Sequence, residues 1–232
     1  MFESVPFPES GWTPLFPLPN AVLLPRAILP LHVFEERYRV MARDALAGER
    51  LIAVALLRTG FERTYHTLDA RIHDVVGVGR ILRDERLPDG RYNLLLQGLA
   101  RASVRSEDHT RPYRRARLMH VPDRGVDPQQ ESELRARLER TLTSRPSCAF
   151  PDCDKCRSVL HCPDIGLSEQ VDILGSIVLR TADLKQEFLS EPRLCVRTER
   201  LCEAIHEVAS ALNAQVLRSR RPRSWPPVTC DN

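Results

Sequence analysis

Four closely spaced cysteines are the residues of this sequence best suited to chemistry. The chain contains seven cysteines, and four of them fall in the pattern C-x4-C-x2-C-x5-C: Cys148, Cys153, Cys156 and Cys162. Four thiolates can hold zinc in a tetrahedral site, and in a reducing compartment a dense cysteine cluster is more often metal-binding than disulfide-bonded. The pattern therefore predicts a Zn²⁺ site with these four cysteines as ligands.

Such a site would be structural, because four protein thiolates leave no coordination position for water. Two alternatives stay open. The C-x4-C-x2-C spacing also allows an iron–sulfur cluster, and the thiols could instead be free or redox-active. His161 is a further candidate ligand, but it is adjacent to Cys162 and is not expected to join it on the same ion. Cys195 and Cys202 are interpreted as small core residues of a helix.

Motifs for nucleotide binding and for common hydrolytic reactions are absent. Neither lysine, Lys155 or Lys185, follows a glycine, so the GxxxxGK[ST] phosphate loop does not occur. The segment Gly77-Val78-Gly79 begins like a dinucleotide loop but lacks the third glycine, and close packing of a strand explains it better. GxSxG and HExxH are missing as well. We therefore expect no nucleotide cofactor and no enzymatic activity.

The composition is that of a soluble globular protein with little net charge. The 232 residues include 34 Lys and Arg against 31 Asp and Glu, which gives +3, and 42% of the residues are hydrophobic. The longest apolar run, Leu51 to Leu57, is far shorter than the roughly 20 residues that cross a bilayer. The N-terminal residues lack the basic and apolar regions of a leader peptide. The expected location is the cytoplasm, without membrane attachment.

The chain divides near residue 125 into two parts of different composition, and the second part must position the cysteines. Eight of the ten glycines lie at or before Gly125, whereas all seven cysteines lie at or after Cys148. Turn-rich β structure uses glycine, and helices avoid it. We therefore expect strands before this division and helices after it.

In the first part, apolar runs of strand length predict strands at 51–57, 75–82, 92–99, 102–105 and 113–121. One amphipathic helix, with Tyr38 and Met41 on its apolar face, is predicted to end at Gly48. After Pro128 the apolar period becomes helical. Helices are predicted to begin at or next to Pro128, Ser168, Asp183 and Pro192. The cysteine cluster lies between the first two of these helices.

Several motifs follow one another through the first part of the chain. They are Pro14-Leu15-Phe16-Pro17-Leu18, Val22-Leu23-Leu24-Pro25, Leu29-Pro30-Leu31-His32-Val33-Phe34-Glu35-Glu36-Arg37-Tyr38, Gly77-Val78-Gly79-Arg80-Ile81, Pro88-Asp89-Gly90-Arg91-Tyr92-Asn93, Gly98-Leu99-Ala100-Arg101 and Tyr113-Arg114-Arg115-Ala116. In this order they resemble the Lon protease N-terminal domain family, also called the Lon substrate-binding domain. The resemblance covers about residues 13 to 122 and extends more loosely to about 212. Two features depart from it: Arg26 stands where the family often has glycine, and the cysteine cluster is not part of its general pattern.

The resemblance implies an α+β fold, in which a PUA-like β-barrel (a pseudobarrel) precedes a C-terminal helical bundle. The expected divisions are an N-terminal extension at 1–12, the barrel domain at 13–124, the helical bundle at 125–217 with a Cys-rich insertion at 146–163, and a flexible tail at 218–232. In Lon enzymes this region engages substrates, upstream of an ATPase and a Ser-Lys protease. We expect a stand-alone bacterial Lon-domain protein without those two domains.

By the same resemblance, the expected function is that of a non-catalytic polypeptide-binding module, an adaptor or accessory in protein quality control. Its partners would be unfolded or partly folded polypeptides, or one protein partner. An RNA-binding PUA-like module is one alternative, suggested by the basic residues Arg111, Arg114, Arg115 and Arg117. A thiol- or metal-dependent sensor is the other.

The family motifs themselves are interpreted as structural. We expect Leu31, Phe34 and Tyr38 in the core and Gly98 at a close approach of two backbones. Glu35 is expected to form an ion pair with Arg37 or Arg101. A peptide site would instead use exposed apolar surface or the edge of a strand.

Overall fold

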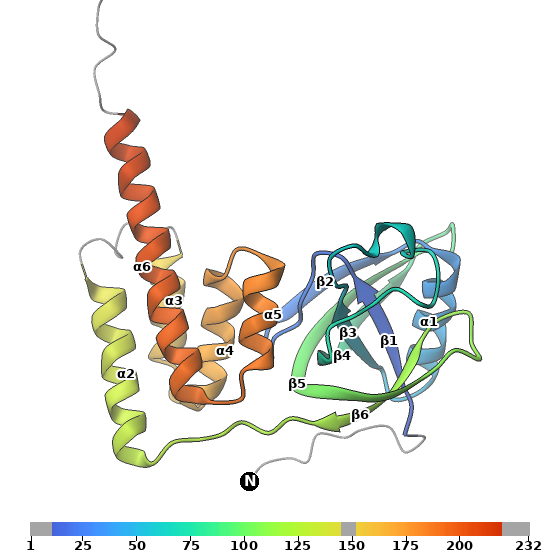
Figure 1. Ribbon diagram of the computed structural model, residues 1–232, viewed down its shortest axis with the longest axis horizontal. Helices are drawn as coiled ribbons and strands as arrows, with labels where there is room; N and C mark the ends of the chain where they lie inside the picture. Colours follow the sequence, from blue (N-terminus) through green and yellow to red (C-terminus); the bar gives the residue numbers. More distant parts are fainter. Residues whose placement is uncertain (1–10, 145–151, 220–232) are drawn as a thin grey trace, which may run out of the picture.

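The computed structural model describes residues 11–144 and 152–219, which form a curved sheet and a helical bundle lying side by side (Figure 1). The strands are β1 (Thr13–Leu18), β2 (Ile28–Val33), β3 (Leu51–Leu56), β4 (Val75–Arg86), β5 (Tyr92–Asp108) and β6 (Arg115–His120). The helices are α1 (Glu36–Ala47), α2 (Pro128–Thr143), α3 (Cys153–Leu160), α4 (Leu167–Val178), α5 (Ala182–Ser190) and α6 (Leu194–Ser219), with a 3-10 turn η1 (Phe61–Arg63). The fold is α+β with C-terminal helices, as predicted. Most of the predicted extension at 1–12 and tail at 218–232 lies outside the described residues.

The sheet is a partly closed barrel with one open edge. Its strand order is β2-β5-β4-β3-β1-β6, and β6 also pairs with β5, so the sheet closes on itself. Only β1 and β3 run parallel among the described strands, with Leu15 opposite Ala53. The long strand β5 spans the two ranges predicted as separate strands at 92–99 and 102–105. Within the same part of the chain β2 pairs with β5 alone, which leaves its second edge unpaired.

Strand β3 explains how the barrel is filled. All six of its residues are buried, and their side chains alternate between two apolar clusters because successive residues of a strand point to opposite faces. Ile52 and Val54 belong to the larger cluster, which continues under α1 and into the bundle. Ala53 and Ala55 belong to a smaller cluster beneath the loop that follows β3. The prediction of a buried strand at 51–57 is confirmed.

Two glycines allow the segment before β2 to lie directly on the sheet. A Cβ atom at Gly77 would stand 1.9 Å from the carbonyl oxygen of Leu23, and one at Gly98 would stand 2.0 Å from that of Leu24. No side chain fits in either place. The expected close approach at Gly98 is confirmed, and strand packing accounts for Gly77.

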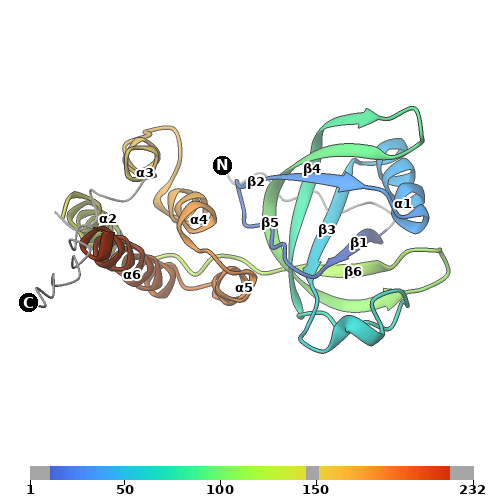
Figure 2. The same ribbon diagram turned by 90° about the horizontal axis from the view of Figure 1, so that it is seen from above.

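The bundle consists of α2, α3, α4 and α6, and α5 lies between it and the sheet, whereas α1 covers the far end of the barrel (Figures 1 and 2). Helix α2 begins after Asp127, whose carboxylate accepts a hydrogen bond from the backbone N–H of Gln130 at 2.8 Å. Two helices begin slightly earlier than predicted, because the N-cap residues are Gly166 and Thr181 rather than Ser168 and Asp183. Helix α3 was not predicted as a helix.

A buried ionic network joins the barrel to the bundle. Arg101 of β5 donates to the carboxylate of Asp172 on α4 at 2.7 Å and to the backbone carbonyl of Leu189 at 3.1 Å. Arg197 of α6 also binds Asp172, and it reaches Asp123 at 3.0 Å. Arg101 binds Asp123 as well. Two arginines thus face two carboxylates, and the charges balance in a place largely closed to water.

Burial alone would raise the pKa of Asp123, but the positive charges of Arg101 and Arg197 outweigh it and lower that pKa. This carboxylate therefore stays ionised at neutral pH and keeps its part in the network. Helix α5 adds a further link, because the side-chain amide of Gln186 donates to the carbonyl of Val75 on β4 at 2.8 Å. The barrel and the bundle are consequently fastened by interactions from three helices.

A strained arginine adds an outer link between the two parts. Arg26 has φ = 62°, in the left-handed region that favours glycine, and its backbone N–H donates to the carbonyl of Gly98 at 2.8 Å. Its side chain donates to the carboxylate of Glu169 on α4 at 2.7 Å. The position at which the family often has glycine is thus one that requires positive φ, and in this chain the arginine adds an ion pair there.

Candidate functional site

The open edge of β2 presents a row of exposed side chains. Ile28, Pro30, His32 and Phe34 occupy alternate positions and all face solvent; the exposed fraction is 50% for Ile28 and 60% for Phe34. The rings of His32 and Phe34 stack with their centroids 6.3 Å apart. The prediction that Phe34 lies in the core is wrong, because β2 is an edge strand and this set of residues points outward.

A shallow groove between β1 and β2 is lined by residues from both sets of side chains. Its volume is about 70 Å³, and its lining residues include Phe16, Leu18, Leu31, Phe34, Tyr38 and Tyr65. Tyr38 is fully buried, which confirms its predicted place in the core, and Leu31 is half-buried. Burial, partly offset by the nearby Arg37 charge, raises the pKa of Tyr38 to about 12, so its phenol stays neutral.

Glu35 and Arg37 hold one wall of this groove. Their side chains form an ion pair with a 3.0 Å N–O separation, which confirms the first of the two predicted pairings; Arg101 pairs elsewhere, as described above. Glu35 also accepts a hydrogen bond from the Tyr65 hydroxyl at 3.0 Å, and Arg37 donates to the Tyr65 carbonyl at 3.0 Å. The loop between β3 and β4 is thereby pinned against the start of α1.

The exposed apolar surface continues from β2 across the outer face of the sheet. Pro30 lies opposite Leu95 of β5, and Leu95 pairs with Arg83 of β4, just after an irregularity that contains Leu82, whose side chain is 45% exposed. Beside them, His32 is hydrogen-bonded to Asn93 at 2.8 Å, and Asn93 donates to Glu85 at 2.8 Å. Exposed or half-buried apolar side chains thus occur on all three strands, beside a hydrogen-bonded polar row.

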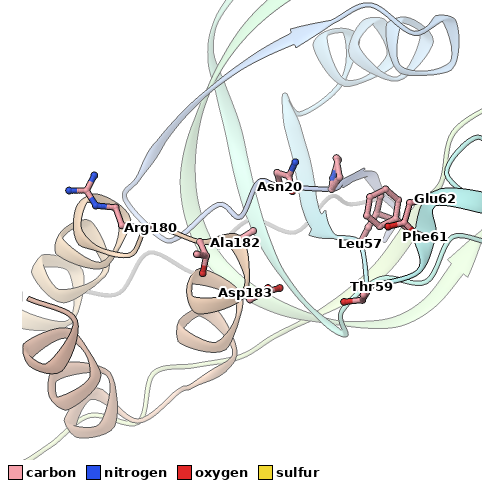
Figure 3. Close-up of a pocket in the computed structure, with 10 residues that line it drawn as sticks. Asn20, Leu57, Thr59, Phe61, Glu62, Arg180, Ala182 and Asp183 are labelled. Carbon is pink, nitrogen blue, oxygen red and sulfur yellow. The ribbon is translucent and has the colours of Figure 1, made fainter. Parts of the chain in front are cut away.

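A second, larger hollow lies between the barrel and the bundle (Figure 3). Its volume is about 460 Å³. The barrel side is formed by the loops after β1 and β3, including Asn20, Leu57, Phe61 and Glu62, and the bundle side by residues 180–183. We call this hollow the barrel–bundle cleft. Its residues come from three separate loops, so no local sequence pattern could have predicted it.

The structure places two of the predicted zinc ligands on one helix. Cys153 and Cys156 lie buried on α3, and the Cys153 thiol donates to the Leu142 carbonyl at 3.4 Å. Burial, together with the nearby Cys153 and Asp152, raises the pKa of the Cys156 thiol to about 12. Cys162 is half-buried beyond the end of α3.

Cys148, the fourth predicted ligand, lies outside the described residues. Within 11–144 and 152–219, no three His, Cys, Asp or Glu side chains converge in a way that could hold a metal ion. The Zn²⁺ site therefore stays a prediction. Of the other thiols, Cys202 is buried in the core as predicted and Cys195 is half-buried.

The arginines that suggested RNA binding have partners within the protein. Arg114 is buried and binds the Glu107 carboxylate through two nitrogens, at 2.6 and 2.8 Å. Arg115 binds Asp108 at 2.8 Å, and Arg111 binds Asp44 at 3.4 Å. The guanidinium of Arg117 lies 4.8 Å from the ring centroid of Trp12. These carboxylates balance most of the local positive charge, which a phosphate-binding face needs to keep.

The molecule is thus an α+β domain in which a partly closed sheet with one open edge is joined to a helical bundle. The family model of the ATP-dependent protease La (LON) substrate-binding domain matches residues 12–207. The chain belongs to this family, and the resemblance found in its motifs is confirmed.

Relatives and solved structures agree with this assignment. The Lon protease of Anaeromyxobacter dehalogenans (strain 2CP-C) is 25% identical over 218 residues, which are 90% of this chain and 26% of that protein. Lon protease 2 of Sorangium cellulosum (strain So ce56) is 30% identical over 118 residues, 51% of this chain and 15% of that protein. The chain thus spans about a quarter or less of these relatives.

Among solved structures, the N-terminal domain of the Mycobacterium avium complex Lon protease superposes with a TM-score of 0.63 and 16% identity, over 84% of this chain and 97% of that one. The Lon N-terminal domain protein from Xanthomonas campestris gives 0.57 and 23%, over 82% and 96%. At these identities the likeness concerns the fold. Within the described residues, none of the helices combines the length and apolar character needed to cross a bilayer.

Proposed function

We propose that this chain is a non-catalytic polypeptide-binding module that accepts an extended, apolar segment of a partly folded protein at the open edge of β2. The observation that carries the proposal is the unpaired edge itself, flanked by the exposed side chains of Ile28 and Phe34. A client segment would add a strand to the sheet, gaining main-chain hydrogen bonds along the edge and side-chain contacts beside it. The family match supports this reading, because it is to a substrate-binding domain.

Pro30 indicates which backbone groups of β2 are available. Proline has no N–H, so a sheet tolerates it at a position whose backbone nitrogen faces away from the neighbouring strand. Successive residues of a strand direct their N–H and C=O groups to opposite edges, so residues two apart share one edge. Pro30 pairs with Leu95 of β5, so its backbone nitrogen faces the open edge. Ile28 and His32 are two residues before and after it, and they therefore direct their N–H and C=O groups to the same edge, together with the Pro30 carbonyl. The missing donor also limits indiscriminate pairing of the edge.

The apolar contribution to such binding is moderate. Burying a large apolar side chain completely stabilises by about 1.5–3 kcal/mol, and Ile28 and Phe34 each have half or more of their surface still exposed. Covering both would contribute about 2 kcal/mol, which corresponds to about a 30-fold gain in affinity. Exchange of clients is therefore expected to be fast, as suits an adaptor or accessory in protein quality control. The family match covers the substrate-binding domain over residues 12–207.

The test is a titration of the full chain with a fluorescently labelled, permanently unfolded polypeptide. Phe34→Ser should weaken binding about 10-fold, because it removes the most exposed aromatic side chain of the edge. Met119→Ser is the matched control, since Met119 is 46% exposed on β6, which pairs with β1 and β5 and not with β2. Binding by neither the wild type nor the variants, or an equal loss in both variants, would contradict the proposal.

A further inference from the structure

We infer that the barrel–bundle cleft is a second contact point for the client, and that it takes a lysine or arginine side chain of an otherwise apolar segment. This inference rests on the proposed function and adds a charge preference to it. The cleft is linked to the edge along the chain: Pro19 and Asn20 line the cleft, and the chain then runs through residues 21–27 to Ile28 at the start of β2.

The cleft has the size and shape of a preformed site. Its volume of about 460 Å³ falls in the range of about 300–1,000 Å³ found for ligand pockets. Its two walls belong to the barrel and to the bundle, and the buried network of Arg101, Asp172 and Arg197 holds these parts in place. On the bundle side, the Thr181 hydroxyl accepts a hydrogen bond from the backbone N–H of Leu184 at 3.2 Å, which fixes the start of α5. A client would therefore bind without first having to open or order the walls.

The two acidic side chains of the cleft come from opposite walls. Glu62 belongs to η1 on the barrel side, and Asp183 belongs to the first turn of α5 on the bundle side (Figure 3). Neither carboxylate has an ion-pair or hydrogen-bond partner among the described residues, whereas neighbouring charged residues such as Arg58 are paired. Arg180 also lines the cleft on the bundle side, but its side chain points away from the barrel wall (Figure 3). The charged lining therefore consists of two carboxylates and one arginine, which leaves an excess of one negative charge.

The rest of the lining suits the stem of a long basic side chain. Leu57 is buried and Phe61 is half-buried at the barrel wall, and Ala182 faces them from α5. Lysine and arginine lay their methylene groups along such apolar surface while the charged end stays near water. The ring of Phe61 offers a cation–π contact in addition. An acidic side chain of a client would be repelled by Glu62 and Asp183, and a neutral one would leave both carboxylates without a partner.

The experiment compares three labelled peptides that share one apolar sequence and differ at a central position, which is arginine, glutamine or glutamate. Dissociation constants are measured by fluorescence anisotropy at low and physiological salt, for the wild type and for a Glu62→Gln/Asp183→Asn double variant. Glu187→Gln is the matched control, because Glu187 is exposed on α5 but does not line the cleft. Both replaced carboxylates are exposed, so the double variant is expected to fold, and its circular dichroism and melting temperature are checked against the wild type.

The wild type should bind the arginine peptide about 3- to 10-fold more tightly than the glutamine peptide, the range expected for two exposed ion pairs. It should bind the glutamate peptide most weakly. The preference should disappear in the double variant, persist in Glu187→Gln and shrink as salt is raised. A wild type without charge preference, or a double variant that keeps it, would overturn the inference.

The outcomes separate the two proposals. If all three peptides bind equally and Phe34→Ser weakens all of them, the edge of β2 binds clients and the cleft does not take a basic side chain. If none of the peptides binds to the wild type, the proposed function itself fails.

Discussion

Replacing Asp172 with asparagine should destabilise the whole molecule, because this carboxylate is the centre of the network that fastens the bundle to the barrel. Its side chain accepts hydrogen bonds from both Arg101 and Arg197, and all three residues are at least 98% buried. The asparagine keeps the shape of the side chain but removes its charge. Two buried guanidinium groups would then share the single carboxylate of Asp123, which is only partly buried.

The magnitude follows from the cost of leaving a buried charge without its partner, about 3–5 kcal/mol. Natural domains have a total stability of about 5–15 kcal/mol, so this loss is a large share of it. In a chain of this length about 4 kcal/mol corresponds to a lowering of the melting temperature by about 8–16 °C. The free energy of unfolding would be measured by urea denaturation followed by far-ultraviolet circular dichroism.

The matched control is Asp74→Asn. Asp74 forms an ion pair with Arg58 at 3.1 Å, but its side chain is 83% exposed. The same chemical change there should cost less than about 1 kcal/mol, because water and salt screen an exposed pair. If Asp172→Asn cost no more than Asp74→Asn, the network would not be what holds the two parts together.

Three further predictions concern single positions. Arg26→Gly should be about 1 kcal/mol more stable than Arg26→Ala, because both lose the pair with Glu169 and only glycine adopts the positive φ without strain; equal stabilities in urea would contradict this. Hydrogen bonds from Arg193 lower the pKa of Glu191 from 4.5 to about 2. Since the folded pKa is the lower one, the contribution of Glu191 is complete above about pH 4.5 and is lost as the pH falls toward 2. The difference in unfolding free energy between wild type and Glu191→Gln should shrink over that range, and a difference independent of pH would argue against the ion pair. Protein purified without chelators should contain about one zinc per chain, which Cys156→Ser should release; absence of zinc and iron would end the metal prediction.

The order of strands and helices was predictable because it depends on local patterns. The change from glycine-rich, strand-length runs to helical spacing near residue 125 reflects how each element buries one face. The close approach at Gly98 was predictable too, since a glycine inside an apolar strand marks a place where a side chain does not fit. Helix α3 was missed because the cysteine spacing was interpreted as a loop around a metal, although Cys153 and Cys156 are also three positions apart on one helix face.

The features that depend on tertiary contacts could not be predicted in this way. Phe34 has the residue type of a core position, and only the sheet order reveals that β2 is an edge and that Phe34 faces outward. The basic run containing Arg114 and Arg115 looked like a charged surface, because its partners Glu107 and Asp108 come from the neighbouring strand. The cleft depends on three loops that only the packing of the bundle against the barrel brings together.

The central claim is that a client adds a strand to the open edge of β2, and amide hydrogen exchange tests it most directly. The full chain is exchanged with and without a saturating unfolded polypeptide, and the rates are compared residue by residue. We predict that the amides of Ile28 and His32 become protected when the client binds, because they donate to its backbone. Binding that leaves these two amides unchanged, or that protects a different surface, would contradict the account.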